Sequence, residues 1–470
     1  MAGHGTKSAP NDELVVLGNG ARPLFFAGAI AAIAGLVVAF AVGLGPDHNL
    51  QPFFFAYLAA YAFFLSIVLG AMFFVLMHHL TAAGWSVSVR RIAESITSLM
   101  PTMAALALPL IVTVVLQSGT LYAWAVKKDL YPPEMQTAVL HGDMEAAERI
   151  HARALGEAPK PDPDLTTAST VPPTPAPHEA LDPITLQKRI TGLHWLNPWM
   201  FAARIMIYAL LWMWMARYYR RLSKRQDTTG DPALSRRMQK WAGLNTVVLG
   251  LTLTGAAGDL FMSLDPHWFS TMWGVYYFAG STIAIFATLI IIVFLLQKAG
   301  YLRNSINREH YQDLGKYLFG FTFFWGYIAF SQYMLLWYSS IPDELGWLSR
   351  HGATTVSVNV NGWSYVVLAI LFGQLLIPFA GLMSRHVKRQ FTILVFWAVW
   401  QLAFHLIDTY WIVMPEYPGR MTAGMVILSI AMTVGMGGLL LAVLIRNMLG
   451  QNLRPVADPR LVESLAFHNI

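Results

Sequence analysis

Long, nearly continuous apolar runs separated by short polar stretches dominate the sequence. Each run is long enough for a helix to cross a hydrocarbon core of about 30 Å. The ten runs lie near residues 22–43, 54–77, 99–124, 199–216, 242–263, 271–297, 317–339, 363–383, 391–413 and 422–445. The pattern predicts an all-α integral membrane protein with about ten transmembrane helices, folded as a single polytopic domain over residues 1–470.

A weak internal repeat runs through the middle eight predicted helices. A shift of 216 residues aligns Tyr61 with Tyr277 and makes the fifth and ninth helices correspond. In those two helices Asp259 and Asp408 each lie seven residues before a proline. The repeat predicts two four-helix bundles in the same orientation, with the first and tenth helices as two flanking helices.

Basic residues mark one side of the membrane. The segment between the fourth and fifth helices carries Arg217, Arg220, Arg221, Lys224, Arg225, Arg236, Arg237 and Lys240. The loops after the first, fifth, seventh and ninth helices carry only Arg350 and Arg420. Because basic loops stay in the cytoplasm, both termini are expected to be cytoplasmic. The formal net charge of +6 follows from this topology and implies no nucleic acid partner.

The residue types that hold redox centres are scarce. The chain has no cysteine, which excludes disulfides, thiolate-held iron–sulfur clusters and covalent c-type haem. A transmembrane b-type haem needs facing pairs of intramembrane histidines, and only His405 lies well inside a predicted span. We therefore expect no cofactor or metal ion bound by this chain itself.

An extracytoplasmic Pro-rich insert, residues 127–197, separates the third and fourth helices. Residues 134–155 are expected to form an amphipathic helix. Residues 159–183, rich in Pro, Thr and Ala, are expected to be extended or mobile. The insert is either a plain surface excursion or a strap that docks a partner outside the membrane.

The ninth helix carries the clearest candidate for proton chemistry. Gln401, His405 and Asp408 are spaced i, i+4 and i+7, so they share one face. Histidine both accepts and donates hydrogen bonds, and a carboxylate one turn away exchanges the proton that histidine passes. A carboxylate in hydrocarbon costs several kcal/mol, roughly 2.5 to 3.5, and so needs a partner or a task. The alternative is a satisfied polar network that pins neighbouring helices together.

Asp259 in the fifth helix is the second candidate. Arg204 lies at a similar depth in the fourth helix, so an ion pair between Arg204 and Asp259 would account for both charges without transport. A buried pair also fixes the protonation state of the acid, so the structural and functional interpretations can coexist.

Titratable residues also gather at the predicted cytoplasmic face. His78 and His79 end the second helix, and Glu94 precedes the third. They are candidates for the entrance of a proton path, and the simpler interpretation is that they face lipid headgroups and water.

Three segments resemble a known family. They are HLTAAGWS at 79–86 continuing to RRIAE at 90–94, MSLDPHWFST at 262–271, and WGYIAFSQYM at 325–334 with WY at 337–338 and IP at 341–342. Together they resemble the F-type membrane subunit of bacterial alternative complex III, within the NrfD/polysulfide-reductase membrane-subunit family. The resemblance covers essentially the whole helical region. The insert at 127–197 does not match the family pattern.

The resemblance implies an integral membrane subunit of a quinol-oxidising respiratory complex in the bacterial cytoplasmic membrane. Its partners would be a second NrfD-like membrane subunit, a multihaem cytochrome c and an iron–sulfur protein, which would carry the haem and iron–sulfur clusters. The chain would support proton conduction and assembly without being catalytic alone. Quinol oxidation belongs chiefly to the sister subunit in that family, so a quinone site on this chain stays open.

Two competing interpretations remain at this level. A stand-alone proton-coupled transporter also suits paired bundles with buried acids, although such a protein should have broken helices and acids nearer the bilayer centre. A purely structural scaffold would have all its acids neutralised, as Arg204 would neutralise Asp259.

Overall fold

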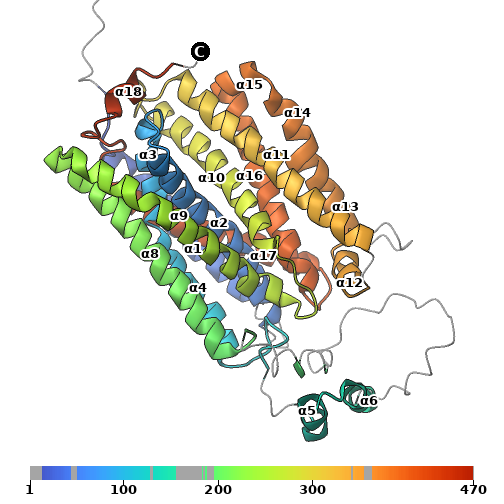
Figure 1. Cartoon of the computed structure of the whole chain (residues 1–470). Coiled ribbons are helices and arrows are strands. Elements are labelled where there is room, and N and C mark those ends of the chain that lie inside the picture. Colours follow the sequence, from blue (N-terminus) through green and yellow to red (C-terminus); the bar gives the residue numbers. More distant parts are fainter. Residues whose placement is uncertain are drawn as a thin grey trace, which may run out of the picture.

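A parallel array of long helices forms the body of the molecule (Figure 1). The computed structural model describes residues 13–43, 50–126, 131–154, 195–339, 342–353 and 362–468, together with 183, 186 and 187. No strand is assigned among these residues. Nine of their helical segments are long and apolar enough to span a membrane. An all-α membrane architecture is thus confirmed.

Four spans form the first bundle. They are α2 (Gln51–Leu80), the pair α3 (Val87–Thr97) and α4 (Met100–Val115), α8 (Pro198–Thr229) and α9 (Pro232–Leu260). In this ring α2 packs on α3 and α9, while α8 packs on α4 and α9. The turn η5 (Met262–Leu264) follows α9.

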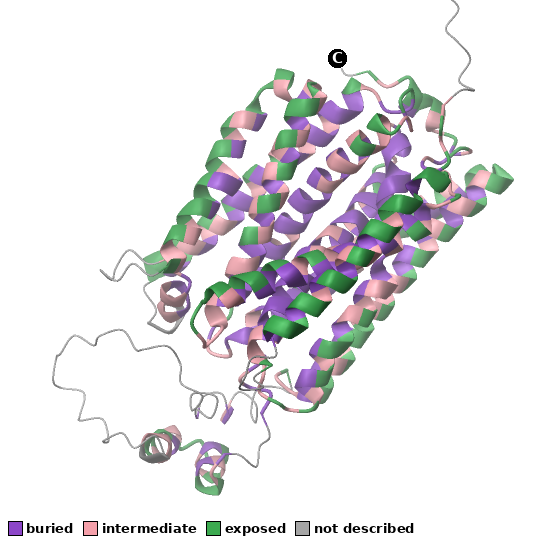
Figure 2. Cartoon of the chain, turned by 180° about the vertical axis from the view of Figure 1, so that it is seen from behind, coloured by how far each residue is buried: buried purple, intermediate pink, exposed green. Residues whose placement is uncertain are grey.

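The second bundle repeats this arrangement. Its members are α10 (Trp273–Lys298), α11 (Arg308–Ser339), the interrupted helix α13 (Gly362–Ile370), η6 (Leu371–Leu376) and α14 (Ile377–Met383), and α16 (Phe391–Val413) with η7 (Met414–Glu416). Here α10 packs on α11 and α16, and the interrupted helix closes the ring. Because α10 also packs on α2 and α9, the two bundles share one core, which appears as the buried centre of Figure 2.

Two flanking helices pack against each other and against α2. They are α1 (Arg22–Gly43), preceded by η2 (Asn19–Ala21), and α17 (Ala423–Met448). A Cβ built on Gly35 would lie 2.4 Å from the backbone nitrogen of Gly435. Glycine is needed there because the two backbones touch, as in other close helix pairs of membrane proteins.

The third span differs from its predicted range of 99–124. It starts at Val87 and ends at Val115, with a break between α3 and α4. The hydroxyls of Ser95, Thr97 and Ser98 bond back to carbonyls three or four residues earlier, and Pro101 has no N–H to continue the ladder. These two effects end α3 and bend the span.

One more long helix, α11, adds to these nine candidate spans. It has 32 residues and starts nine residues before the predicted run at 317–339. It lies among the nine spans in Figure 1 although its average composition is less apolar. The N-terminal segment pairs with the C-terminal one through Val16 and Asn452, so the first and last described segments lie at one end of the array. This shared end requires an even number of crossings, so α11 completes the set of about ten.

The two ends of the array differ in the short elements that they carry, and we call them the basic end and the insert end. The basic end holds α15 (Arg385–Arg389) and α18 (Leu461–Leu465), and the insert end holds α5 (Pro133–Leu140), α6 (Met144–Ala154) and α12 (Pro342–Arg350) (Figure 1). The single amphipathic helix expected over 134–155 is two short helices, with Gly142 at positive φ between them. Residues 159–182, which cover nearly all of the stretch predicted to be extended, lie outside the described residues.

Candidate functional site

The polar stripe on α16 is buried inside the second bundle, as its spacing predicts. Gln401, His405 and Asp408 are each at most 1% exposed. All three face other helices, because Gln401 donates to Thr322 Oγ1 of α11 at 2.6 Å and His405 contacts Ser66 of α2. The stripe therefore lies where the two bundles meet.

The hydrogen bonds of His405 fix which ring nitrogen carries its hydrogen. Ser66 Oγ donates its only hydrogen to the carbonyl of Phe63 at 2.6 Å and lies 2.8 Å from His405 Nε2. Ser66 must therefore accept from Nε2–H, which leaves Nδ1 as a bare acceptor. Within the described part of the chain, no hydrogen-bond partner reaches that nitrogen.

Asp408 faces this bare nitrogen. Its Oδ2 lies 3.8 Å from His405 Nδ1, while its Oδ1 accepts a hydrogen bond from the hydroxyl of Tyr276. Two acceptors that face each other repel unless a proton lies between them. The geometry thus favours one exchangeable proton held by the Asp408–His405 pair.

Close backbone packing brings α10 against this pair. A Cβ built on Gly280 would lie 2.7 Å from His405 Cε1 and 3.9 Å from Asp408 Oδ2. A side chain at position 280 would displace the imidazole of His405. Because Gly280 has no side chain, the imidazole fits between α2 and α10.

An irregular helix borders the same stripe. Gln401 Nε2 lies 3.2 Å from the carbonyl of Gln374, within the π-helical segment η6, and Trp400 Nε1 donates to Gly373 in that segment at 2.7 Å. Side chains on α16 thus satisfy backbone carbonyls of the irregular turn. The side chain of Gln374 is fully buried and lies beside the carboxylate of Asp408, which the side chain of Trp325 also approaches.

Asp259 has a different environment from Asp408 despite its matching place in the repeat. Arg204 Nε and Nη2 lie 2.9 and 2.7 Å from its two carboxylate oxygens, which is bidentate pairing. Tyr208, one turn after Arg204, donates to the same carboxylate at 3.2 Å. The ion pair expected from the sequence is therefore present. Among the described residues, no arginine or lysine forms an ion pair with Asp408.

The titratable group at the basic end is buried instead of facing headgroups. His78, His79 and Glu94 are 1%, 5% and 1% exposed, so the simpler interpretation from the sequence is wrong. The helix α3, which carries Glu94, packs against α8 and α18. Glu94 pairs with the guanidinium of Arg91 at 3.0 Å and with that of Arg90 at 3.5 Å.

This group is separate from the stripe on α16. Ser66 and His78 both lie on α2, twelve residues apart, which is about 18 Å along a helix. Buried aromatic rings fill the region near His78, which stacks on Phe74 and contacts Tyr317. The structure does not bring the two sets of predicted residues together.

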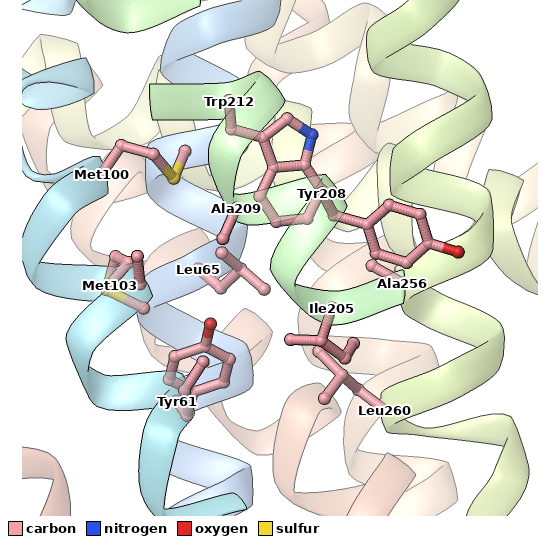
Figure 3. A pocket seen from close by; sticks show the side chains of 12 residues that line it. Tyr61, Leu65, Met100, Met103, Ile205, Tyr208, Ala209, Trp212, Ala256 and Leu260 are labelled. Carbon is pink, nitrogen blue, oxygen red and sulfur yellow. The ribbon is translucent and has the colours of Figure 1, made fainter. Parts of the chain in front are cut away.

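A small apolar pocket lies inside the first bundle, between α2, α4, α8 and α9 (Figure 3). Its polar atoms come from Tyr61, Tyr208 and Trp212, and the indole of Trp212 is already bonded to Thr252 at 2.8 Å. Tyr208 links the wall of the pocket to Asp259. Within the described residues no group of three or more His, Cys, Asp or Glu side chains is placed to hold a metal ion.

Three groups at the site were not found from the sequence. Tyr276, Ser66 and Thr322 come from α10, α2 and α11 and touch the stripe through tertiary packing alone. Tyr208 could have been found, since it is four residues after Arg204 on the same helix face.

Comparison with models of known protein families gives no match, and comparison with curated protein sequences gives none either.

Proposed function

We propose that the chain is an integral membrane subunit of a quinol-oxidising respiratory electron-transfer complex and that it conducts protons at the Asp408–His405 pair. It would lie in the bacterial cytoplasmic membrane with both termini in the cytoplasm. Electron transfer would take place in partner subunits.

The observation that carries the proposal is the buried Asp408–His405 contact. A carboxylate without an arginine or lysine partner is costly at this depth, and a proton held against His405 Nδ1 removes that cost. Gln401 and Ser66 then hold the pair in place through hydrogen bonds. Such a group releases its proton when its surroundings change, which is what a conduit needs.

Two of the three segments that resemble the family lie near the buried acids. Trp325 of the third segment packs on Tyr276 with ring centroids 5.7 Å apart, and Tyr276 bonds Asp408. The second segment joins α9, which carries Asp259, to α10. The resemblance thus involves residues near both acids, which supports a shared function.

Exchange of Asp408 for asparagine tests the proposal. Asp408→Asn keeps the shape and much of the hydrogen bonding but removes the titratable group, so assembly should persist while proton release during turnover falls by on the order of 10²-fold. Asp408→Leu should instead impair assembly, because it leaves polar partners unsatisfied at about 1 to 3 kcal/mol each. Both variants are compared in sealed membrane vesicles at equal protein abundance. Normal proton release by the asparagine variant would refute conduction at this helix.

The alternative is a stand-alone proton-coupled transporter, and interrupted helices favour it. The third span breaks between α3 and α4, and the eighth contains the π-helical segment η6. These interruptions do not occupy matching positions of the two bundles, since α11 is the counterpart of α3 and α4 and is continuous. Purification from the native membrane separates the two functions, because only the respiratory subunit should copurify with a c-type cytochrome.

A further inference from the structure

A second group of charges lies at the insert end, where α16 runs on into η7. Arg350 at the end of α12 bonds Asp265 and lies 3.6 Å from Glu416 Oε1. His351 Nδ1 lies 3.7 Å from the same oxygen. The side chain of Glu416 is 11% exposed and that of Arg350 is 38% exposed, so the group extends from the interior to the surface.

His351 adds a buried imidazole to this group. Its Nδ1 lies 3.0 Å from the carbonyl of Trp347, which can only accept, so Nδ1 carries the hydrogen. Its Nε2 makes no hydrogen bond of good geometry within the described residues, and the fully buried ring also lies beside the backbone of Ile412. Burial lowers the pKa of His351 to about 3, which keeps the ring neutral.

Aromatic rings join this group to the Asp408 site. Tyr276, which bonds Asp408, stacks on Trp273 with centroids 5.3 Å apart. Trp273 contacts Trp268 at 5.0 Å, and Trp268 stacks on Trp347 at 4.2 Å. Trp347 in turn stacks on His351 with centroids 3.8 Å apart, so a continuous row of ring contacts connects the two sites.

Glu416 lies close enough to Asp408 for a proton to pass between them in one or two transfers. Asp408 on α16 and Glu416 at the end of η7 are eight residues apart, which is about 12 Å along a helix. That separation is too long for direct transfer and suits transfer through one or two intermediate polar groups or waters.

We propose that Glu416 is the group through which the Asp408–His405 pair exchanges protons with the solution at the insert end. This inference rests on the proposed conduction at Asp408. The proton leaves the carboxylic acid of Asp408, the carboxylate of Glu416 takes it up, and Glu416 then releases it to water. Arg350 and His351 are positioning residues. Asp265, His267, Arg350 and His351 are the charged or titratable groups that act on Glu416.

Passive proton flux tests this proposal without any substrate. The full-length protein is reconstituted into sealed vesicles of phosphatidylethanolamine and phosphatidylglycerol, a potassium diffusion potential drives protons, and an enclosed pH-sensitive dye reports them. Glu416→Gln should lower the flux by on the order of 10²-fold. Glu145→Gln is the matched control, because Glu145 is an exposed acid of α6 at the same end and, among the residues that the structure describes, pairs with Arg149 alone. Formate added at the insert end should restore flux in Glu416→Gln by carrying protons in its place.

The outcomes separate this proposal from the proposed function. Flux that falls in Asp408→Asn but stays at the wild-type rate in Glu416→Gln would overturn the role of Glu416 alone. Flux unchanged in both variants, or absent from the wild type, would overturn conduction itself. A loss in Glu416→Gln that formate does not restore would indicate a structural role and would also overturn the proposal.

A second variant keeps the test valid where Glu416→Gln does not fold. Arg350→Gln removes the cation that favours the ionised form of Glu416, so Glu416 should hold its proton more tightly. The pH of half-maximal flux should then rise relative to the wild type. An unchanged pH profile in folded Arg350→Gln protein would contradict the assignment.

Discussion

At the scale of single residues, two acids in equivalent helices have opposite surroundings. Two nitrogens of the Arg204 guanidinium donate hydrogen bonds to the carboxylate of Asp259, and the charges of the two residues balance. Asp408 instead meets neutral groups, which are the hydroxyl of Tyr276, the imidazole of His405 and the side chains of Gln374 and Trp325. A balanced ion pair holds its acid ionised, whereas an acid against a neutral imidazole exchanges a proton. The first bundle thus has a structural pair where the second has the candidate for chemistry.

The Arg204–Asp259 pair gives a prediction for stability. Arg204→Met leaves Asp259 buried without its cation, and we expect the free energy of unfolding to fall by about 3 to 5 kcal/mol. The double variant Arg204→Met/Asp259→Asn should lose less than Arg204→Met alone, because no uncompensated charge remains. Denaturation in detergent measures both losses, and a double variant less stable than either single variant would contradict the pairing.

Two neighbouring tyrosines give a matched pair of variants. Tyr276 donates to Asp408, whereas Tyr277 donates to the carbonyl of Ala62 at 2.7 Å. Each change to phenylalanine should cost about 1 kcal/mol of stability or somewhat more. Only Tyr276→Phe should alter proton flux and its pH dependence, because only that hydroxyl touches the proposed site. Equal effects of both variants on flux would show that the hydroxyl of Tyr276 has no role beyond packing.

At the scale of elements, helix irregularities and glycine contacts position the site. The segment η6 bends the eighth span where Gln401 and Trp400 bond its carbonyls. The contact between Gly280 and His405 brings α10 close to α16. Neither feature follows from the apolar pattern, because a π-helical turn and a close backbone approach arise from the neighbouring helices.

The pairing of α1 with α17 is the element-level prediction. Gly35→Ala places a Cβ 2.4 Å from the backbone of Gly435, so the helices must separate, and we expect a loss of about 1 to 3 kcal/mol. Gly250→Ala on α9 is the control, because its Cβ would meet nothing within 4 Å. Thermal unfolding of both variants compares them. A Gly35→Ala protein as stable as the control variant would mean that the two helices pack less closely than described.

At the scale of the whole molecule, the two ends of the array should lie on opposite sides of the membrane. Gly142 lies between α5 and α6 and Gly230 between α8 and α9, and a Cβ on either would meet nothing within 4 Å. Tags inserted at these two positions should therefore be tolerated. The basic residues of α8 and α9 predict that the tag at 142 is accessible from outside and the tag at 230 from the cytoplasm. Labelling of intact cells measures this, and the reverse pattern would place Asp408 nearer the cytoplasm.

The apolar runs by themselves determined the class of the protein and most of its helices. A helix must satisfy its own backbone in lipid, so a run of about 20 apolar residues specifies a span with little help from its neighbours. The spacing of Gln401, His405 and Asp408 likewise placed them on one face. Similar depth in adjacent helices was enough to predict that Arg204 pairs with Asp259.

Tertiary structure alone decided what each polar residue meets. Tyr276, Ser66 and Thr322 reach the stripe from three other helices, and the apolar pattern does not encode the rotation of those helices about their axes. The same limit explains why His78 and Glu94 seemed interfacial, since burial at a span end depends on whether a distant segment such as α18 covers it. Helix formation is local and is read from the chain, whereas the partner of a buried charge is set by packing between segments hundreds of residues apart.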